Sequence, residues 1–447
     1  MKFYIKAMAV FLILSLIAVP LFTGCNRGED NGDGDETTEE AAPPEEPKPH
    51  KVGFVYRGAV ENSTHNLLWE NARSQLERNL GVETCYVEDV FVQNFREAVE
   101  LLVSHDVTVV VSTSHSFENA VRSVALDYKD IDFISLGGEG TLSNLTIFNP
   151  LLYQPANVCG LAAAFNAVSP VIGIVADARM YNCAGVINAY IQGKKEYLTT
   201  RVETRINYVS STNETEVKRA IDDLVEQGHD VIMLYMSTDY GIKYCEEIGV
   251  RVIAYAGNLP ELAPNNYITG FYFNVDSYLT EQVRFIQNNS FQPTTRYGGL
   301  DSGHARMIRL NPDETIVDPV TERLTNALYK GIVEHDMVFM GEIIDNQGQL
   351  QVESGVVLTQ KEALTIAWLD FSVREHPTRF SDPVEHPAIV PLVVRGEWDK
   401  SVVSSAPDDE QSTEEPPSTA TTVATTAATT AAETTTAEPD ETTTQAA

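Results

Sequence analysis

From residue 51 the chain alternates short β-branched, apolar runs with amphipathic stretches of helical length. The first run, KVGFVY, precedes HNLLWENARSQLERNLG, in which Leu68, Ala72 and Leu76 share one face and Gly81 ends the helix. The later strand-like runs are ETCYV, VTVVVST, IDFISLGG and LTIFNP, with helices expected at 95–103 and 117–126. Runs such as VTVVVS have no polar face, so helices should cover both sides of their sheet. This series predicts a doubly wound, parallel α/β lobe.

A second series of the same kind begins after the apolar helix QPANVCGLAAAFNAV. It contains the strand-like runs PVIGIVA, TRINYV, DVIMLYM and VRVIAYA, with helices expected at 184–197, 214–226 and 240–248. Two successive series of about 100 residues each predict two similar lobes. The expected fold class is therefore α/β, with two doubly wound parallel-sheet lobes joined by a hinge.

Charge changes the picture at both ends of the chain. The 447 residues carry 31 Lys and Arg against 64 Asp and Glu, a formal net charge of −33. Residues 26–50 and 401–447 hold 9 acids each, with only Arg27 and Lys48 as bases. This acidity argues against a nucleic-acid partner. The middle, 51–400, is long enough for two domains.

The first 25 residues have the pattern of a signal peptide, because Lys2 and Lys6 precede an apolar run over 7–22. The next letters, LFTGC, resemble the lipobox of bacterial lipoproteins, in which the cysteine, here Cys25, becomes the lipidated N-terminus. A plain secretory peptide is the alternative. The acidic stretch 26–50 suits a flexible tether. We expect a protein anchored by lipid to the cell membrane and facing outside the cytoplasm.

The C-terminal segment 401–447 is dominated by Thr, Ala, Pro and Glu, as in TTVATTAATTAAETTTAEPDETTT. Such a composition cannot form a packed core and predicts disorder. An O-glycosylated stalk and a solubilising tail both fit this segment, and the sequence leaves the two open.

Besides Cys25, the chain has Cys85, Cys159, Cys183 and Cys245. An even number outside the cell permits disulfides. Each, however, lies in an apolar strand or helix pattern, which favours buried free thiols. There is no CxxC pair, and the 9 His form no HxH or HExxH. Neither a metal nor another cofactor is expected.

Ligands of open α/β sheets bind beyond the carboxyl ends of the strands, so the loops that follow each strand are the candidate site. In the first series these loops offer Asn62, His65, Asn66, His115 and Phe117. In the second series they offer Asp177, Tyr181, Thr238, Asp239 and Tyr240. Asn62 and Asn66 also suit an Asx turn and a helix N-cap. Together these groups predict a cleft for a small, planar, polar ligand.

Catalytic patterns are missing from the sequence, which has no GxSxG and no GxxxxGK[ST]. One alternative is that His65, His115 and Glu139 form a metal or acid/base cluster across neighbouring loops. The exported, two-lobed pattern favours a binding protein over an enzyme.

Over 51–375 the sequence resembles the basic membrane protein (BMP) family of ABC-transporter substrate-binding lipoproteins. The segments that carry the resemblance are, in order, KVGFVYRG, VVVSTS, GVINAYIQG, YGGLDSGHARMIRLN and GEIIDNQGQLQVESGVVL. The resemblance implies a type I periplasmic-binding-protein fold and a purine nucleoside or base as ligand. It also implies an ABC permease as partner and action as a monomer.

The resemblance guides the choice of site residues. His65 stands where relatives carry the aromatic residue that stacks on the base. Two further positions depart from the family, because Ala256 replaces an Asp of many members and Tyr272 stands where relatives often have Trp. The candidate ligand-binding residues are Asn62, His65, Asn66, Ser114, Phe117, Tyr181, Asp239, Asn258 and Tyr272.

We therefore expect two lobes that close on a purine-like molecule by hinge rotation and deliver it to a permease. The expected division is 1–25 signal peptide, 26–50 tether, 51–165 with about 266–298 N-terminal lobe, 166–265 with about 299–400 C-terminal lobe, and 401–447 tail. The hinge is expected near 164–169, 260–269 and 298–303.

Three alternatives stay open at this point. The same lobes would also serve a sensor that presents its ligand to a signalling receptor without transport. An enzyme such as a nucleoside hydrolase would use Asp239 and Glu139. A surface adhesion or scaffolding lipoprotein would use its tail and bind no small molecule.

Overall fold

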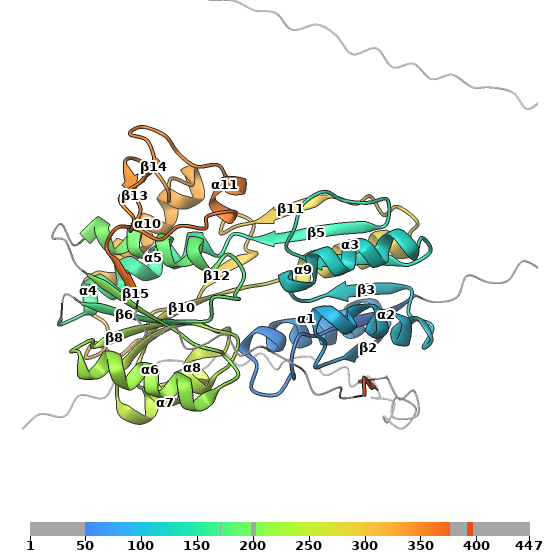
Figure 1. The fold of residues 1–447 in the computed structure, drawn as a ribbon, viewed down its shortest axis with the longest axis horizontal. Helices are drawn as coiled ribbons and strands as arrows, with labels where there is room; N and C mark the ends of the chain where they lie inside the picture. The colour runs from blue at the N-terminus through green and yellow to red at the C-terminus, as the bar shows by residue number, and fades with distance from the viewer. Residues whose placement is uncertain (1–49, 170, 198–202, 376–390, 397–447) are drawn as a thin grey trace, which may run out of the picture. The chain divides into compact units, whose positions relative to one another are not determined.

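The computed structural model describes residues 50–169, 171–197, 203–375 and 391–396. Two seven-stranded sheets with helices on both faces form two lobes (Figure 1). The expected α/β, doubly wound, two-lobed fold is thereby confirmed. The expected signal peptide, the tail, and the tether up to residue 49, with Cys25, lie outside the described residues.

The first sheet has the strand order β11-β5-β4-β3-β1-β2-β16. Its strands are β1 (Lys51–Val55), β2 (Glu83–Val87), β3 (Val109–Ser112), β4 (Asp132–Leu136), β5 (Leu145–Pro150), β11 (Thr295–Gly298) and β16 (Val394–Arg395). All neighbours run parallel except β16, which is antiparallel to β2. The helices are α1 (Thr64–Leu80) and α9 (Asp276–Gln287) on one face, and α2 (Phe95–Val103) and α3 (Glu118–Asp127) on the other.

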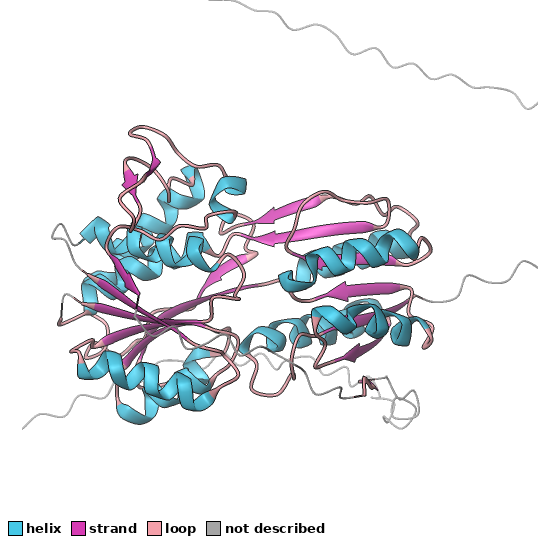
Figure 2. Ribbon diagram, viewed as in Figure 1, coloured by secondary structure: helices cyan, strands magenta, loops and turns pink. Residues whose placement is uncertain are grey.

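The second sheet has the order β12-β10-β9-β8-β6-β7-β15. Its strands are β6 (Ile172–Ala176), β7 (Thr204–Tyr208), β8 (Val231–Tyr235), β9 (Arg251–Tyr255), β10 (Tyr267–Phe273), β12 (Ala305–Met307) and β15 (Val373–Glu375). The helices are α4 (Tyr153–Asn166), α5 (Cys183–Tyr197) and α10 (Val320–His335) on one face, and α6 (Glu214–Glu226), α7 (Tyr240–Ile248) and α8 (Leu259–Leu262) on the other. Figure 2 shows this sheet (magenta) between its helical layers (cyan).

Local chemistry explains where these elements begin and end. Every residue of β3 is buried, as a strand covered on both faces requires. Ser63 caps α1 by accepting a hydrogen bond from the Asn66 backbone N–H, and Gly81 ends the helix in the left-handed conformation with φ of 62°. The four cysteines expected to form no disulfide, Cys85, Cys159, Cys183 and Cys245, are all buried, and none is in a disulfide in the described part of the chain.

The chain crosses between the lobes at 150–153, 273–276 and 298–305, which differs from two of the three expected crossings. Helix α4, expected in the first lobe, packs on α5 of the second. The cause is close backbone contact, because a Cβ at Gly160 would lie 1.9 Å from the carbonyl oxygen of Tyr190, and one at Gly193 would lie 1.7 Å from that of Asn157. Strand β10, also expected in the first lobe, pairs with β9 in the second sheet.

The last part of the chain also divides differently from the expectation. Residues 394–395, expected in the second lobe, form β16 at the edge of the first sheet. A small hairpin, β13 (Ile343–Ile344) and β14 (Leu350–Val352), and helix α11 (Gln360–Leu364) precede β15. This segment is joined to α5 by buried Asp370, whose carboxylate accepts from Lys195 at 2.5 Å and Gln192 at 2.9 Å. Among the described residues, no helix is both long and apolar enough to span a membrane.

Candidate functional site

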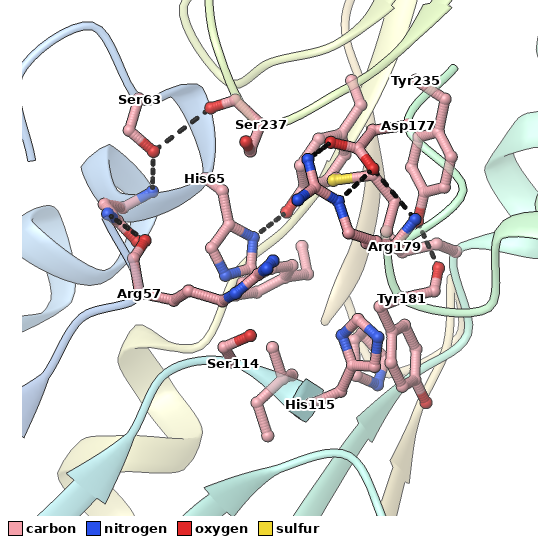
Figure 3. Close-up of a pocket in the computed structure, with 17 residues that line it drawn as sticks. Arg57, Ser63, His65, Ser114, His115, Asp177, Arg179, Tyr181, Tyr235 and Ser237 are labelled. Carbon is pink, nitrogen blue, oxygen red and sulfur yellow. Dashed lines mark hydrogen bonds and ion pairs between the residues drawn. The ribbon is translucent and has the colours of Figure 1, made fainter. Parts of the chain in front are cut away.

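A cavity of about 50 Å³ lies between the carboxyl ends of the strands of both lobes (Figure 3). It follows the general rule for α/β sheets, because loops after β1, β3, β4, β6 and β8 meet there. Its wall is formed by Arg57, Ser63, His65, Asn66, Ser114, His115, Leu136, Pro150, Leu152, Asp177, Arg179, Met180, Tyr181, Tyr235, Ser237, Tyr255 and Phe273.

Aromatic rings from both lobes make up much of this wall. The rings of His115 and Tyr181 meet edge to face with centroids 5.6 Å apart, and those of Tyr235 and Tyr255 do so at 5.5 Å. Such edges and faces suit a flat, conjugated ligand, which stacks on them or meets them edge-on.

His65 joins the two lobes through both ring nitrogens. Its Nε2 lies 2.8 Å from the carbonyl oxygen of Thr113 in the first lobe, and its Nδ1 lies 3.0 Å from the hydroxyl of Tyr255 in the second. Since a carbonyl only accepts, Nε2 carries the proton and Nδ1 accepts from Tyr255. Burial lowers the pKa of His65 to about 4, so the imidazole is neutral at physiological pH.

His115 is also held neutral. Burial, aided by repulsion from protonated His65 and from Arg57, lowers the pKa of His115 to about 4. Neither ring nitrogen of His115 has a hydrogen-bond partner among the described residues, so this ring can donate one hydrogen bond to a ligand and accept another.

Asp177 and Arg179 form an ion pair at the cavity wall (Figure 3). Asp177 Oδ1 accepts from the Arg179 backbone N–H at 3.0 Å and Nε at 2.9 Å, and Oδ2 accepts from Nη2 at 2.8 Å. Ser211 adds its backbone N–H and hydroxyl to Oδ2, at 2.9 and 2.8 Å. Burial alone would raise the pKa of Asp177, but the Arg179 and Ser211 contacts outweigh it and lower the pKa.

Direct contacts between the lobes border the cavity. The Ser63 hydroxyl donates to the carbonyl oxygen of Ser237 at 3.1 Å, and the Asp239 backbone N–H donates to that of Asn62 at 3.1 Å. Tyr181 donates its hydroxyl proton to Asn149 Oδ1 at 3.0 Å. The structure is therefore a closed arrangement of the two lobes.

Four of the nine candidate residues line this cavity: His65, Asn66, Ser114 and Tyr181. The Asn66 amide nitrogen lies 2.9 Å from the carbonyl oxygen of Ala59 and 3.3 Å from those of Arg57 and Gly58. Its side-chain oxygen has no partner among the described residues. Asn66 thus fixes the first-lobe loop and still offers one acceptor.

The other five candidates lie outside the cavity wall. Asn62 contributes only its backbone oxygen, to the contact with Asp239. Phe117 packs in the first-lobe core against Phe95, with ring centroids 4.8 Å apart. Asp239 forms an ion pair with Lys243 at 2.7 Å, and Asn258 precedes α8 with its Oδ1 buried and unpaired. Tyr272 lies on β10 opposite Arg306.

The candidate set omitted several cavity residues. Tyr235 and Tyr255 end β8 and β9, and their apolar runs predict core residues rather than site residues. Asp177 and His115 lie in the loops singled out from the sequence but were not among the nine candidates. Arg57 directly follows the first strand-like run, and its position after a carboxyl end was the signal available.

The alternative metal or acid/base cluster is not assembled. Within the part of the chain that the structure describes, no group of three His, Cys, Asp or Glu side chains is placed to hold a metal ion. Glu139 instead forms an ion pair with Lys361 of α11 at 2.6 Å.

Two α/β lobes with a closed, aromatic cavity between them define the two-lobed class of solute-binding proteins. The chain belongs to the Bmp family of ABC transporter substrate-binding proteins, PnrA-like, whose family model matches residues 50–334. This is a family of solute-binding proteins that act outside the cytoplasm, and it is not a family of enzymes.

Individual relatives are distant and their names differ in ligand. A purine-binding protein of Brucella abortus is 20% identical over 264 residues, covering 58% of this chain and 74% of the relative. A Haloferax volcanii protein named for glucose binding in an ABC transporter is 21% identical over 272 residues, covering 60% and 69%. A solved ABC-transporter solute-binding protein from Aeropyrum pernix K1 shares the fold with a TM-score of 0.57 at 14% identity, covering 65% and 95%.

Proposed function

We propose that this substrate-binding protein captures a purine base or nucleoside in the cavity between its lobes and delivers it to an ABC permease. The observation that carries the proposal is the combination of aromatic rings from both lobes with the neutral, unpaired imidazole of His115. Rings suit a purine's faces, and an imidazole that both donates and accepts matches the alternating donors and acceptors on a purine's edge. A relative named as a purine-binding protein supports this choice.

Binding is proposed to close the lobes by rotation about the three crossings at 150–153, 273–276 and 298–305. A ligand that touches Tyr181 on one lobe and His115 on the other favours the closed state, because the open state loses one set of contacts. Four of the nine sequence candidates, His65, Asn66, Ser114 and Tyr181, are retained as site residues, joined by His115 and Tyr255.

The lipid anchor is a separate part of the proposal. Acyl chains on Cys25 would hold the protein at the outer side of the cell membrane, and residues 26–49 would span the distance to the first lobe. Labelling cells with an alkyne fatty acid should tag the wild-type protein and not the Cys25→Ser variant. Equal labelling of both would exclude this anchor. Sedimentation of the purified protein should give a monomer.

A thermal-shift screen of the purified chain tests the ligand. We expect stabilisation by purines, and a ligand at a hundredfold excess over its Kd adds about 2.7 kcal/mol to the free energy of unfolding. His115→Ala should abolish the shift, whereas His335→Ala, whose side chain is exposed on α10, should keep it. A shift with glucose and none with any purine would contradict the proposal.

A further inference from the structure

The carboxylate of the cavity wall is fully occupied. Asp177 is the one carboxylate among the described wall residues, and its two oxygens already accept five hydrogen bonds from Arg179 and Ser211. A carboxylate has about four lone-pair sites. The two neighbouring hydroxyls of a ribose would therefore find no free carboxylate lone pair to accept their hydrogen bonds.

The tyrosine hydroxyls of the wall are engaged within the protein as well. Tyr181 donates to Asn149, Tyr235 donates to the carbonyl oxygen of Tyr181 at 2.5 Å, and Tyr255 donates to His65. These contacts use the donors of all three hydroxyls. Besides their rings, these tyrosines can offer a ligand only the remaining lone pairs of their oxygens.

The charged groups of the wall are mostly hydrogen-bond donors. Two guanidinium groups, Arg57 and Arg179, and a single carboxylate, Asp177, line the cavity, while both imidazoles are neutral. Guanidinium groups only donate. The wall therefore favours a ligand rich in acceptors, such as ring nitrogens and carbonyl oxygens.

The closed cavity is also small. One water needs about 10–15 Å³ of cavity volume of this kind, so a cavity of about 50 Å³ holds roughly three to five waters. At about 30 Å³ of liquid per water, this corresponds to roughly 90–150 Å³ of ligand. That space suits one flat ring system and is smaller than a ring system with an attached sugar.

We infer that the ligand is a free, carbonyl-bearing nucleobase rather than a nucleoside or an amino-substituted base. The inference rests on the proposed function and narrows it. The flat ring lies among Tyr181, Tyr235 and Tyr255, its carbonyl oxygen accepts from a guanidinium, and His115 pairs with its edge. A ribose would have to break the Asp177–Arg179 contacts or hold the lobes apart.

Three commercial compounds separate these features. Hypoxanthine and adenine differ at C6, carbonyl against amine, and at N1, which carries a proton only in hypoxanthine. Inosine is hypoxanthine with a ribose. Calorimetric titration of the full chain should give hypoxanthine a Kd at least about tenfold below those of adenine and inosine, as expected when a charge-assisted hydrogen bond is gained or a buried partner is lost. Inosine or adenine binding as tightly as hypoxanthine would overturn the inference and leave the proposed function standing.

Two arginine variants test whether a guanidinium of the wall selects the carbonyl-bearing base. Arg57→Gln should bring the hypoxanthine-to-adenine ratio of affinities close to one. The matched control is Arg96→Gln, which removes a guanidinium from the exposed pair with Asp127, outside the cavity wall, and should keep the ratio. An unchanged ratio in Arg57→Gln would overturn the role given to this residue. Failure of all three compounds to bind the wild-type chain would overturn the inference together with the proposed function.

Discussion

His65 and His115 show how burial sets the chemistry of single residues in this cavity. Both imidazoles have a pKa of about 4, well below the ordinary 6.5, because burial removes water from them. His65 gains two hydrogen bonds in compensation, one to each lobe, whereas His115 gains none among the described residues. The first ring therefore stabilises closure and the second is available to the ligand.

The lowered pKa values predict how ligand affinity depends on pH. In the open lobes both imidazoles should titrate near 6.5, so below that pH each must release its proton before closure. Affinity should be constant above about pH 7 and should fall between pH 6.5 and 4, by up to two decades per pH unit for two groups. Calorimetric titration across this range measures the slope. His65→Gln should reduce the slope by about one decade of affinity per pH unit. An affinity that stays constant down to pH 5 would contradict the proposed release of protons on closure.

Sequence reasoning at the residue scale succeeded where position along a strand was informative. His65, Asn66, Ser114 and Tyr181 follow strand ends, and the carboxyl-end rule placed them at the cavity. Phe117 also follows a strand, but the 3₁₀ turn that carries it directs the ring into the core. Which way a side chain points depends on the turn, and single-sequence patterns do not fix turns.

At the scale of elements, the N-terminus of α1 combines two tasks in one residue. The Ser63 oxygen accepts from the Asn66 backbone N–H at 3.0 Å, and its proton goes to the carbonyl oxygen of Ser237 in the other lobe at 3.1 Å. Ser63 therefore both caps this helix and makes a hydrogen bond that exists only when the lobes are closed.

Replacing this serine should affect stability and ligand affinity together. Ser63→Ala should lower the free energy of unfolding by about 1 kcal/mol through loss of the cap, and should weaken ligand binding about two- to tenfold through loss of the interlobe hydrogen bond. Asn213→Ala removes the cap of α6, which bonds Glu216 within one lobe, and should cost stability alone. Urea unfolding and titration of both variants measure the difference. Equal affinities in the two variants would rule out a role of Ser63 in closure.

Replacement by alanine should have opposite effects at two helical glycines, Gly160 in the α4–α5 contact and Gly331 on α10, where a Cβ has open space. Gly160→Ala would force a Cβ to within 1.9 Å of the Tyr190 carbonyl oxygen, so the helices must separate, at a cost of about 1–3 kcal/mol or more. Gly331→Ala on α10 meets no atom within 4 Å and should stabilise the protein by about 0.5–1 kcal/mol, since alanine favours helix. Thermal unfolding of the two variants tests both signs, and a neutral Gly160→Ala would contradict the observed packing.

The same packing explains an error made at this scale. The helical pattern around α4 was readable, but its apolar residues extend all around the helix and do not indicate which lobe covers it. Gly160 and Gly193 were the available signal, because glycines within helices often mark close contacts. Pairing them with each other required the structure.

For the whole molecule, the balance between open and closed lobes determines function. The Glu139–Lys361 ion pair has side chains 46% and 63% exposed, so solvent screens it and it stabilises the closed lobes only weakly. The backbone and side-chain contacts near Ser63 and Asn149 add a few hydrogen bonds. Contacts this modest leave the ligand able to shift the equilibrium through what it gains from both lobes.

The number of lobes and their α/β class could be predicted from the sequence because both depend on local patterns that repeat along the chain. The membership of β10 and β16 could not, since strand pairing joins residues far apart in sequence. Strand β16 returns from the end of the chain to the first sheet, and its two paired residues carry too little pattern to predict this. Two of the three crossings were misplaced for the same reason.

A crystal structure of the protein grown with hypoxanthine is the most direct test of the central claim, that the cavity between the lobes is the binding site. We expect the ring among Tyr181, Tyr235 and Tyr255, with a His115 ring nitrogen within hydrogen-bonding distance of its edge. A closed protein with the ligand bound elsewhere, or an empty cavity at saturating hypoxanthine, would contradict the account.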